Sequence, residues 1–407
     1  MERQPSLPCS GLEGNQEAER SFSSEFAALN MGTPPKRPSI PGLVGSKVET
    51  SRVPSLDGLR AVSIGMVLIA HSAGSIPALE SHPLILYTFG NGNRGVSVFF
   101  VISGFLITSL LLKEERRKGA ISLRDFYIRR ALRILPPFYV FLAFLILAWQ
   151  LGQITTNWRS LGVSFVFLRD YFGGDWWTGH SWSLSVEEQF YLLWPMTLAL
   201  LGRNWAKRIS LFLIAGSPVM RTAFHILVGR QQGPIENFML HMRVDGLMFG
   251  CALALYQEDP HVDRFLEKIL RWPLLLAALG FLVFGSGILT QRFQGYYLLP
   301  FGYTLENLAI TYVIVYFVRR PLSIGGRLLN CSPMVHIGLI SYSLYLWQEA
   351  FLTPNLNVSL SGRFPYNWIC TFAAAELSWL IIEKPALKLR RQFTNRITPL
   401  IARQEAA

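Results

Sequence analysis

The sequence predicts an all-α integral membrane protein, a polytopic bundle of transmembrane helices. Of its 407 residues, 51% are hydrophobic and only 16% are charged, whereas a soluble domain carries about 25% charged residues. Apolar runs alternate with short basic loops from about residue 56 to about residue 385. One membrane domain accounts for this pattern better than several soluble domains.

Ten segments have close to the length needed to cross a bilayer. They are residues 57–75, 94–112, 135–152, 183–202, 208–228, 238–257, 273–290, 302–318, 335–352 and 367–383. The basic segment KEERRKGAISLRDFYIRRALR follows the second of them and is expected to be cytoplasmic, which makes both termini cytoplasmic. Arg60 is then nearer the cytoplasmic side and His71 nearer the outer side. Residues 158–172 are expected to form an outer loop or a re-entrant helix.

The chain divides into three parts by composition. Residues 1–52 are polar, lack an apolar run, and are expected to be a disordered extension. Residues 53–388 form the membrane-embedded domain, and residues 389–407 form a short basic cytoplasmic tail. The net charge of +12 comes from loops beside apolar segments, which indicates membrane topology and anionic lipid headgroups rather than nucleic acid. The four cysteines show no metal-ligand spacing, so neither zinc nor disulfides are expected.

The most informative pair is Arg60 and His71, which lie in one apolar segment with ten residues between them. An ionisable side chain inside a membrane span predicts a functional site. Eleven helical steps of about 100° put both side chains on one helix face, about 16 Å apart along the axis, where they can flank an elongated ligand. His71 can act as a general base toward a hydroxyl group, or can be a histidine hydrogen-bonded within the bundle. Asp57 is expected to pair with Arg60.

The second and third segments add basic candidates. Arg94 is either a snorkelling interfacial residue or a substrate contact. Arg130 and Arg133 fall on one helical face and suit the phosphates of a nucleotide cofactor, although topology and lipid anchoring are the alternative. Pro136 and Pro137 are expected to end that helix and start the next span. Four small residues in the second segment favour close helix packing, namely Gly95, Ser97, Ser103 and Gly104.

The fourth segment opens with HSWSLSVEEQFYLLWP. Ser185 and Glu188 match a capping box, so part of this sequence is a helix start. Glu187 is not needed for that cap. With His180 and Trp182, the two carboxylates form a plausible polar site, in which a carboxylate orients an imidazole or binds a sugar hydroxyl.

Two later segments carry polar residues with a structural alternative. Arg243 and Asp245 are expected to be exposed near the interface, with Gly246 and Gly250 in helix packing. The ninth segment presents polar side chains that either line a cavity or join helices, with joining slightly favoured; they are Ser341, Tyr342, Ser343, Tyr345 and Gln348. No GxSxG elbow, Walker loop, dinucleotide fingerprint or HExxH motif occurs.

Six of these pieces together resemble the acyltransferase-3 family of integral membrane O-acyltransferases. The pieces are SLDGLRAVSI with its downstream His71, GVSVFFVISGFLIT, FYIRRALRILPPFY, WSLSVEEQFYLLWP, RVDGLMFG and ISYSLYLWQ, in the family's order over most of residues 55–385. The family's Arg-ten-His pattern corresponds to Arg60 and His71, and its Arg-x-x-Arg element to Arg130 and Arg133. Its acidic element corresponds to Trp182, Ser183, Glu187 and Glu188.

The resemblance implies a ten-helix domain that transfers an acyl group, often acetyl, from cytoplasmic acyl-coenzyme A to a hydroxyl of a cell-envelope glycan or small molecule. The expected catalytic residues are His71, Arg60 and Glu187, with coenzyme A held by Arg130, Arg133 and Arg60. The expected substrate contacts are Asp57, Arg94, Trp182 and Glu188. Glu187 orients His71 or holds the acceptor, and an acyl-His71 intermediate is the alternative to direct transfer. No metal is expected.

The chain also departs from some members of that family. It ends soon after the last predicted span, so no appended esterase-like domain is expected, and the acyl group should pass directly to its acceptor or to a separate protein. Residues 1–52 lie outside the family pattern. A bacterial inner membrane is the expected location. A secondary transporter or flippase explains ten spans and buried charges equally well, but not a phosphate-like site beside a general base.

Overall fold

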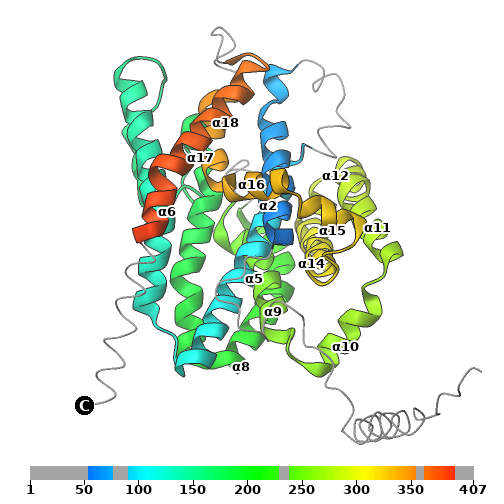
Figure 1. The fold of residues 1–407 in the computed structure, drawn as a ribbon. Helices are drawn as coiled ribbons and strands as arrows, with labels where there is room; N and C mark the ends of the chain where they lie inside the picture. Colours follow the sequence, from blue (N-terminus) through cyan, green and yellow to red (C-terminus); the bar gives the residue numbers. More distant parts are fainter. Residues whose placement is uncertain (1–53, 77–89, 229–237, 354–361, 390–407) are drawn as a thin grey trace, which may run out of the picture. The chain divides into compact units, whose positions relative to one another are not determined.

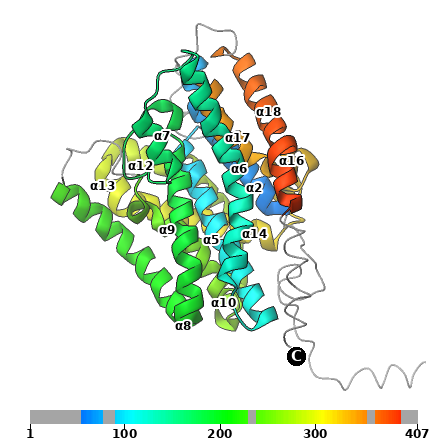
Figure 2. The same cartoon turned by 90° about the vertical axis from the view of Figure 1, so that its left-hand side faces the viewer.

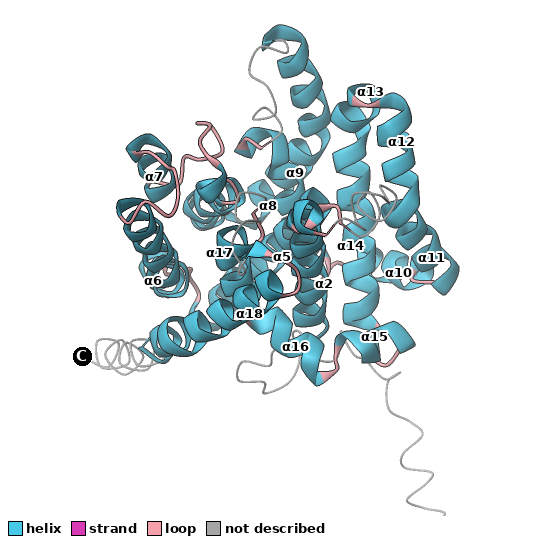
Figure 3. Ribbon diagram, turned by 90° about the horizontal axis from the view of Figure 1, so that it is seen from above, coloured by secondary structure: helices cyan, strands magenta, loops and turns pink. Residues whose placement is uncertain are grey.

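The computed structural model describes residues 54–76, 90–228, 238–353 and 362–389, which form helices and connecting loops without a strand (Figure 3). The predicted all-α class is confirmed. The first half contains α2 (Pro54–His71), η1 (Ala73–Ser75), α5 (Gly92–Lys118), α6 (Leu123–Gln150), α7 (Trp158–Phe165), η2 (Trp176–Thr178) and α8 (Ser181–Val228). The predicted extension at 1–52 and most of the basic tail lie outside the described residues.

The second half contains shorter helices, several of them joined by π-helical turns. They are α9 (Leu240–Tyr256), α10 (Pro260–Ile269), α11 (Trp272–Gly280), η4 (Phe281–Gly285), α12 (Ser286–Phe293), α13 (Gly295–Tyr297), η5 (Leu298–Gly302), α14 (Tyr303–Arg319), α15 (Ile324–Leu329), α16 (Ser332–Leu339), α17 (Ser341–Phe351), α18 (Tyr366–Ser378) and η8 (Trp379–Glu383). Figures 1 and 2 show α5, α6, α8 and α9 running alongside one another.

Five helical segments of the described chain are long and apolar enough to cross a membrane: 92–118, 123–150, 176–228, 272–293 and 295–319. The third includes two predicted spans, because its backbone leaves the helical region at Gly202 (φ 74°, ψ 176°) and two helices meet there. The basic segment RNWAKR follows this kink, where the sequence predicts a loop. The count of ten spans and the cytoplasmic termini stay predictions.

Helix α5 lies at the centre of the bundle and packs against α2, α9 and α14 (Figure 1). Two glycines let α5 and α9 approach closely. A Cβ at Gly104 would lie 2.0 Å from Leu247 O, and a Cβ at Gly250 would lie 2.1 Å from Val101 O. Side chains at these positions would collide with backbone, so the predicted role in helix packing is confirmed for these two glycines.

The outer surface of the bundle is apolar. Large hydrophobic side chains on α6 and α8 are exposed, including Leu147, Leu192, Leu200 and Phe212. Exposure of this kind is typical of a surface that faces lipid acyl chains, where helices satisfy their own backbone hydrogen bonds. The chain is therefore an integral membrane protein.

Two predicted boundaries differ from the structure. Helix α6 continues through Pro136 and Pro137 instead of ending there, because membrane helices tolerate proline where neighbouring groups satisfy the released carbonyls. The ninth predicted span breaks at Ile340 into α16 and α17. Helix α7 has eight residues, far fewer than the roughly 20 needed to cross a bilayer, as expected for residues 158–172.

Candidate functional site

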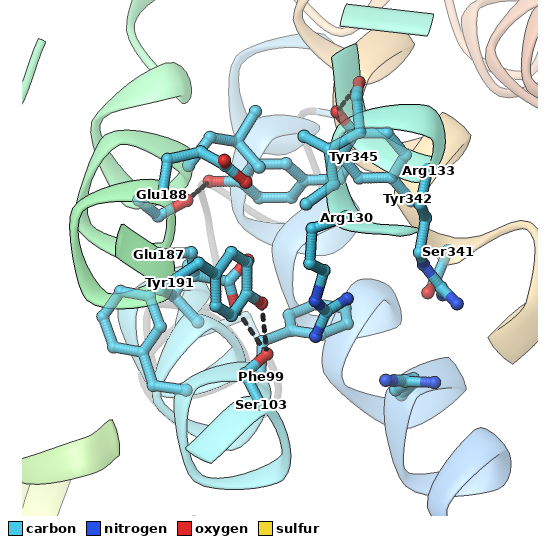
Figure 4. A pocket seen from close by; sticks show the side chains of 16 residues that line it. Phe99, Ser103, Arg130, Arg133, Glu187, Glu188, Tyr191, Ser341, Tyr342 and Tyr345 are labelled. Carbon is cyan, nitrogen blue, oxygen red and sulfur yellow. Dashed lines mark hydrogen bonds between the residues drawn. The ribbon is translucent and has the colours of Figure 1, made fainter. Parts of the chain in front are cut away.

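A polar cavity lies between α2, α5, α6, α8 and α17 (Figure 4). The empty space in and directly outside its mouth is about 720 Å³, open solvent included. Three guanidinium groups and two carboxyl groups line it, from Arg60, Arg130, Arg133, Glu187 and Glu188. The structure thus brings together five residues that the sequence analysis selected, from three helices distant in the sequence.

Hydrogen bonds and an aromatic ring fix one wall of the cavity. Ser103 Oγ donates to Glu187 Oε1 at 2.6 Å, and Tyr191 OH donates to Ser103 Oγ at 3.2 Å (Figure 4). The guanidinium carbon of Arg130 lies 4.3 Å from the centre of the Tyr191 ring, a cation–π contact. Within the described chain no carboxylate forms an ion pair with Arg130, so its guanidinium group remains available to an anionic ligand.

Arg60 enters the cavity from the first third of α2. Its Nη1 lies 3.4 Å from Asp57 Oδ1, which confirms the predicted pairing one helical turn apart. Asp57 is covered by α16, since a Cβ at Gly338 would lie 1.9 Å from Asp57 O. This close packing holds the start of α2 and therefore fixes the direction of the Arg60 side chain.

His71 ends α2 and contacts a carboxylate that the sequence analysis did not select. His71 Nε2 lies 3.7 Å from Glu349 Oε1, on α17. The other oxygen, Glu349 Oε2, accepts from His180 Nδ1 at 2.6 Å and from the His180 backbone N–H at 3.1 Å. Two donors thus orient Glu349, whose free oxygen is directed at His71.

The hydrogen bonds of His71 define which ring nitrogen carries the proton. Its Nδ1 lies 3.1 Å from Val67 O, and a carbonyl oxygen only accepts, so Nδ1 is the donor. In the neutral ring the lone pair is then on Nε2, the nitrogen that faces Glu349. Trp176 holds the ring from the side in an edge-to-face contact at 5.7 Å. This arrangement can accept a proton at Nε2 and stabilise the resulting imidazolium.

Helix α17 connects the cavity to the histidine cluster. Ser341 and Tyr345 line the cavity, and Glu349 contacts His71, each four residues after the last on one helix face. Tyr345 OH donates to His180 O at 2.9 Å and lies 2.5 Å from Ser183 Oγ. Arg60 and His71 both face α17, as the helical periodicity of α2 predicts.

Two other predicted site residues, Arg94 and Trp182, lie outside the cavity. Arg94 is 3% exposed and donates to Glu306 Oε1 from both Nε and Nη2, at 3.2 and 2.8 Å, so it neither snorkels nor lines the cavity. Trp182 packs edge-to-face on Phe100 at 6.1 Å and does not line the cavity. Of the two roles predicted for Glu187, orienting His71 is wrong, because Glu349 contacts His71. The other role, holding the acceptor, stays a prediction.

Two further predictions are wrong, namely the capping box at Ser185 and the exposure of Arg243 and Asp245. Helix α8 begins at Ser181, so Ser185 lies inside it, donates to Ser181 O and accepts from the Arg169 N–H. A cap at Ser185 would make Val186 the first helical residue, whereas α8 begins five residues earlier. Arg243 and Asp245 are 3% and 1% exposed, because surrounding helices cover α9.

The polar residues of the ninth segment serve both predicted roles. Ser341, Tyr342 and Tyr345 line the cavity. The two tyrosines also join helices, because Tyr342 OH donates to Ile134 O and Tyr345 OH donates to His180 O. Ser343 joins helices by a hydrogen bond to Glu383 of η8. Sequence reasoning missed Glu349, although it is the only acid of the predicted span 335–352, and the criterion that selected His71 would have found it.

Comparisons with known proteins identify the family of the chain. A family described as an acyltransferase domain matches residues 53–383. The chain is 29% identical over 372 residues to peptidoglycan O-acetyltransferase OatA of Listeria monocytogenes, which covers 83% of this chain and 56% of that protein. It is 28% identical over 365 residues to O-acetyltransferase OatA of Staphylococcus aureus, with 83% and 57% covered. The chain thus spans little more than half the length of these relatives. No solved structure matches it.

Proposed function

We infer that this chain, which belongs to the acyltransferase family matched by residues 53–383, is a membrane-bound O-acyltransferase. Its acceptor is a hydroxyl of a cell-envelope carbohydrate, and the group transferred is acetyl. The names of the two relatives, both O-acetyltransferases and one acting on peptidoglycan, support this assignment. The proposed location of the protein is a bacterial inner membrane.

The donor in the proposal is acyl-coenzyme A from the cytoplasm, with its phosphates on Arg130 and Arg133. Guanidinium groups recognise phosphate oxygens through paired hydrogen bonds. The position of both arginines in one cavity supports this docking site. The pantetheine arm then extends past Arg60 toward His71, about 16 Å further along α2.

The chemical step uses His71 as the general base. Its Nε2 takes the proton of the acceptor hydroxyl while the hydroxyl oxygen bonds to the thioester carbonyl carbon. The C–S bond breaks, the acyl group remains on the acceptor as an ester, and the thiolate of coenzyme A receives the proton from His71. Glu349, at 3.7 Å from Nε2, stabilises the intervening imidazolium, and His180 positions Glu349.

One observation carries the proposal. A single face of α17 joins the arginine-lined cavity, through Ser341 and Tyr345, to the carboxylate that contacts His71. This arrangement supports the proposed route from the donor phosphates to the general base. The relatives named above are O-acetyltransferases, so the transporter alternative gains no support from them.

The test uses purified protein in liposomes with acetyl-coenzyme A, and follows free thiol release with and without an envelope glycan extract. Release should depend on the extract and be lost in His71→Ala. The matched control is His336→Ala, an exposed histidine that bonds Glu376 at 3.1 Å and should keep full activity. Equal release by wild type and His71→Ala would overturn the role of His71. Labelled acetyl-coenzyme A without acceptor separates direct transfer, which leaves the protein unlabelled, from an acyl-His71 intermediate.

A further inference from the structure

A second buried polar cluster lies where α5, α8, α9 and α14 meet, outside the cavity. It contains two complete ion pairs. Arg94 Nη2 lies 2.8 Å from Glu306 Oε1, and Arg221 Nη1 lies 3.0 Å from Asp245 Oδ2. All four side chains are at most 6% exposed. Each of these charges therefore has a partner of opposite sign.

Arg243 is the exception in this cluster. It is 3% exposed, and none of the described carboxylates forms an ion pair with it. Its Nη2 donates to Ser97 Oγ at 2.9 Å and to Asn93 O at 3.4 Å, while the guanidinium group lies 4.2 Å from the Tyr303 ring centre. A buried charge without a counter-ion is costly, and a cation within a membrane protein predicts a functional site.

Three buried polar atoms of the cluster lack a hydrogen-bond partner. They are Nη1 of Arg243, Nη1 of Arg94 and Oδ1 of Asn307. Asn307 lies against Gly246, one turn beyond Arg243 on α9, since a Cβ there would be 3.3 Å from Oδ1. Two unsatisfied cationic donors and one unsatisfied acceptor fit a ligand that carries anionic oxygens beside a hydroxyl group.

The cluster lies at the His71 end of the bundle. Asn93, which accepts from Arg243, follows Gly92, and a Cβ on Gly92 would lie 3.1 Å from the Cβ of Ala70. Ala70 directly precedes His71. The first turn of α5 therefore separates Arg243 from the end of α2, a separation that an oligosaccharide can span.

We propose that Arg243, together with Arg94 Nη1 and Asn307 Oδ1, binds an anionic group of the acceptor, so that the acceptor is an acidic carbohydrate. The anionic group is a carboxylate or a phosphate. This inference rests on the proposed function, because it names the class of molecule that receives the acyl group. Arg243 binds and positions the acceptor and takes no part in the proton transfer.

The test measures binding by the full-length protein in nanodiscs, by calorimetry, without a donor. The probes are a disaccharide with one carboxylate, the same disaccharide with one phosphate, and the neutral methyl ester of the first. Wild type should bind one or both charged probes roughly tenfold to a hundredfold more tightly than the ester. Arg243→Gln should abolish this preference, and the exposed control Arg264→Gln should retain it.

Equal binding of all three probes by wild type, or an unchanged preference in Arg243→Gln, would overturn the site. If Arg243→Gln does not fold, the same binding measurement is made with Arg243→Lys, which keeps the positive charge but lacks the planar guanidinium group. That variant should reduce the preference several-fold, and an unchanged preference would count against the site. Charge-selective binding without any acyl transfer would contradict the proposed function alone.

Discussion

Glu349→Gln gives the sharpest prediction about the site, because it removes a charge and leaves the shape. The amide oxygen of Gln can still accept from His180, so the geometry of the cluster is expected to persist. What is lost is the attraction between a carboxylate and the His71 imidazolium at 3.7 Å. At an effective dielectric constant of about 20 this attraction is about 4.5 kcal/mol, or roughly three decades in rate.

The assay is kcat for acyl transfer to the envelope glycan extract, measured for wild type, Glu349→Gln and Glu376→Gln. Glu376 is the matched control, since it contacts His336 at 3.1 Å on the exposed surface, where such pairs contribute about 0–1 kcal/mol. Glu349→Gln should lose about a thousandfold in kcat with an unchanged unfolding temperature. A loss below about tenfold in the folded variant would refute the imidazolium argument. Combined with His71→Ala, Glu349→Gln should cause no further loss.

Three further variants test other parts of the account. Arg130→Gln with Arg133→Gln should raise the Kd for acetyl-coenzyme A by roughly tenfold to a hundredfold in a filter-binding assay, because two charged phosphate contacts are lost. Gly104→Leu should destabilise the bundle by about 3 kcal/mol or more in thermal unfolding, since its side chain meets the backbone of α9. Burial raises the pKa of the Asp170 carboxyl, in the loop before α8, to about 6. The folded state then holds this proton more tightly than the unfolded state does. The free energy of unfolding should therefore fall as pH rises from about 4 to about 6, by at most about 3 kcal/mol. The variant Asp170→Asn should remove this pH dependence.

Each of these variants also has a result that would contradict the prediction made for it. An unchanged donor Kd in the double arginine variant would remove the docking site. For the glycine, the control is Gly216→Ala, whose Cβ has no neighbour within 4 Å and should be tolerated; equal tolerance of Gly104→Leu would contradict the close packing. For the pH profile, identical slopes in wild type and Asp170→Asn would show that another group is responsible.

The sequence was sufficient for features that depend on local periodicity. The hydropathy pattern predicts the apolar segments. A rotation of about 100° per helical residue predicts that Arg60 and His71 share one face of α2. The three-residue spacing of Asp57 and Arg60 predicted their ion pair, and the spacing of Arg130 and Arg133 predicted their common side. These relations hold within one helix and need no knowledge of its neighbours.

Relations between helices could not be predicted in the same way. Glu187 and Glu349 are both acids inside apolar segments, and only the packing of α17 against α2 decides which one contacts His71. Arg243 resembles an interfacial anchor in the sequence, but α5, α8 and α14 cover α9 and bury it. The capping box at Ser185 does not start a helix, because α8 already begins at Ser181.

The most direct test of the central claim separates donor binding from chemistry in one variant. The Kd for acetyl-coenzyme A and the rate of ester formation on the glycan acceptor would be measured for His71→Ala beside wild type, in the same liposomes. We predict an unchanged Kd and a rate lower by about a thousandfold or more, because the arginine-lined cavity remains while the base is gone. Ester formation at the wild-type rate in His71→Ala would contradict it.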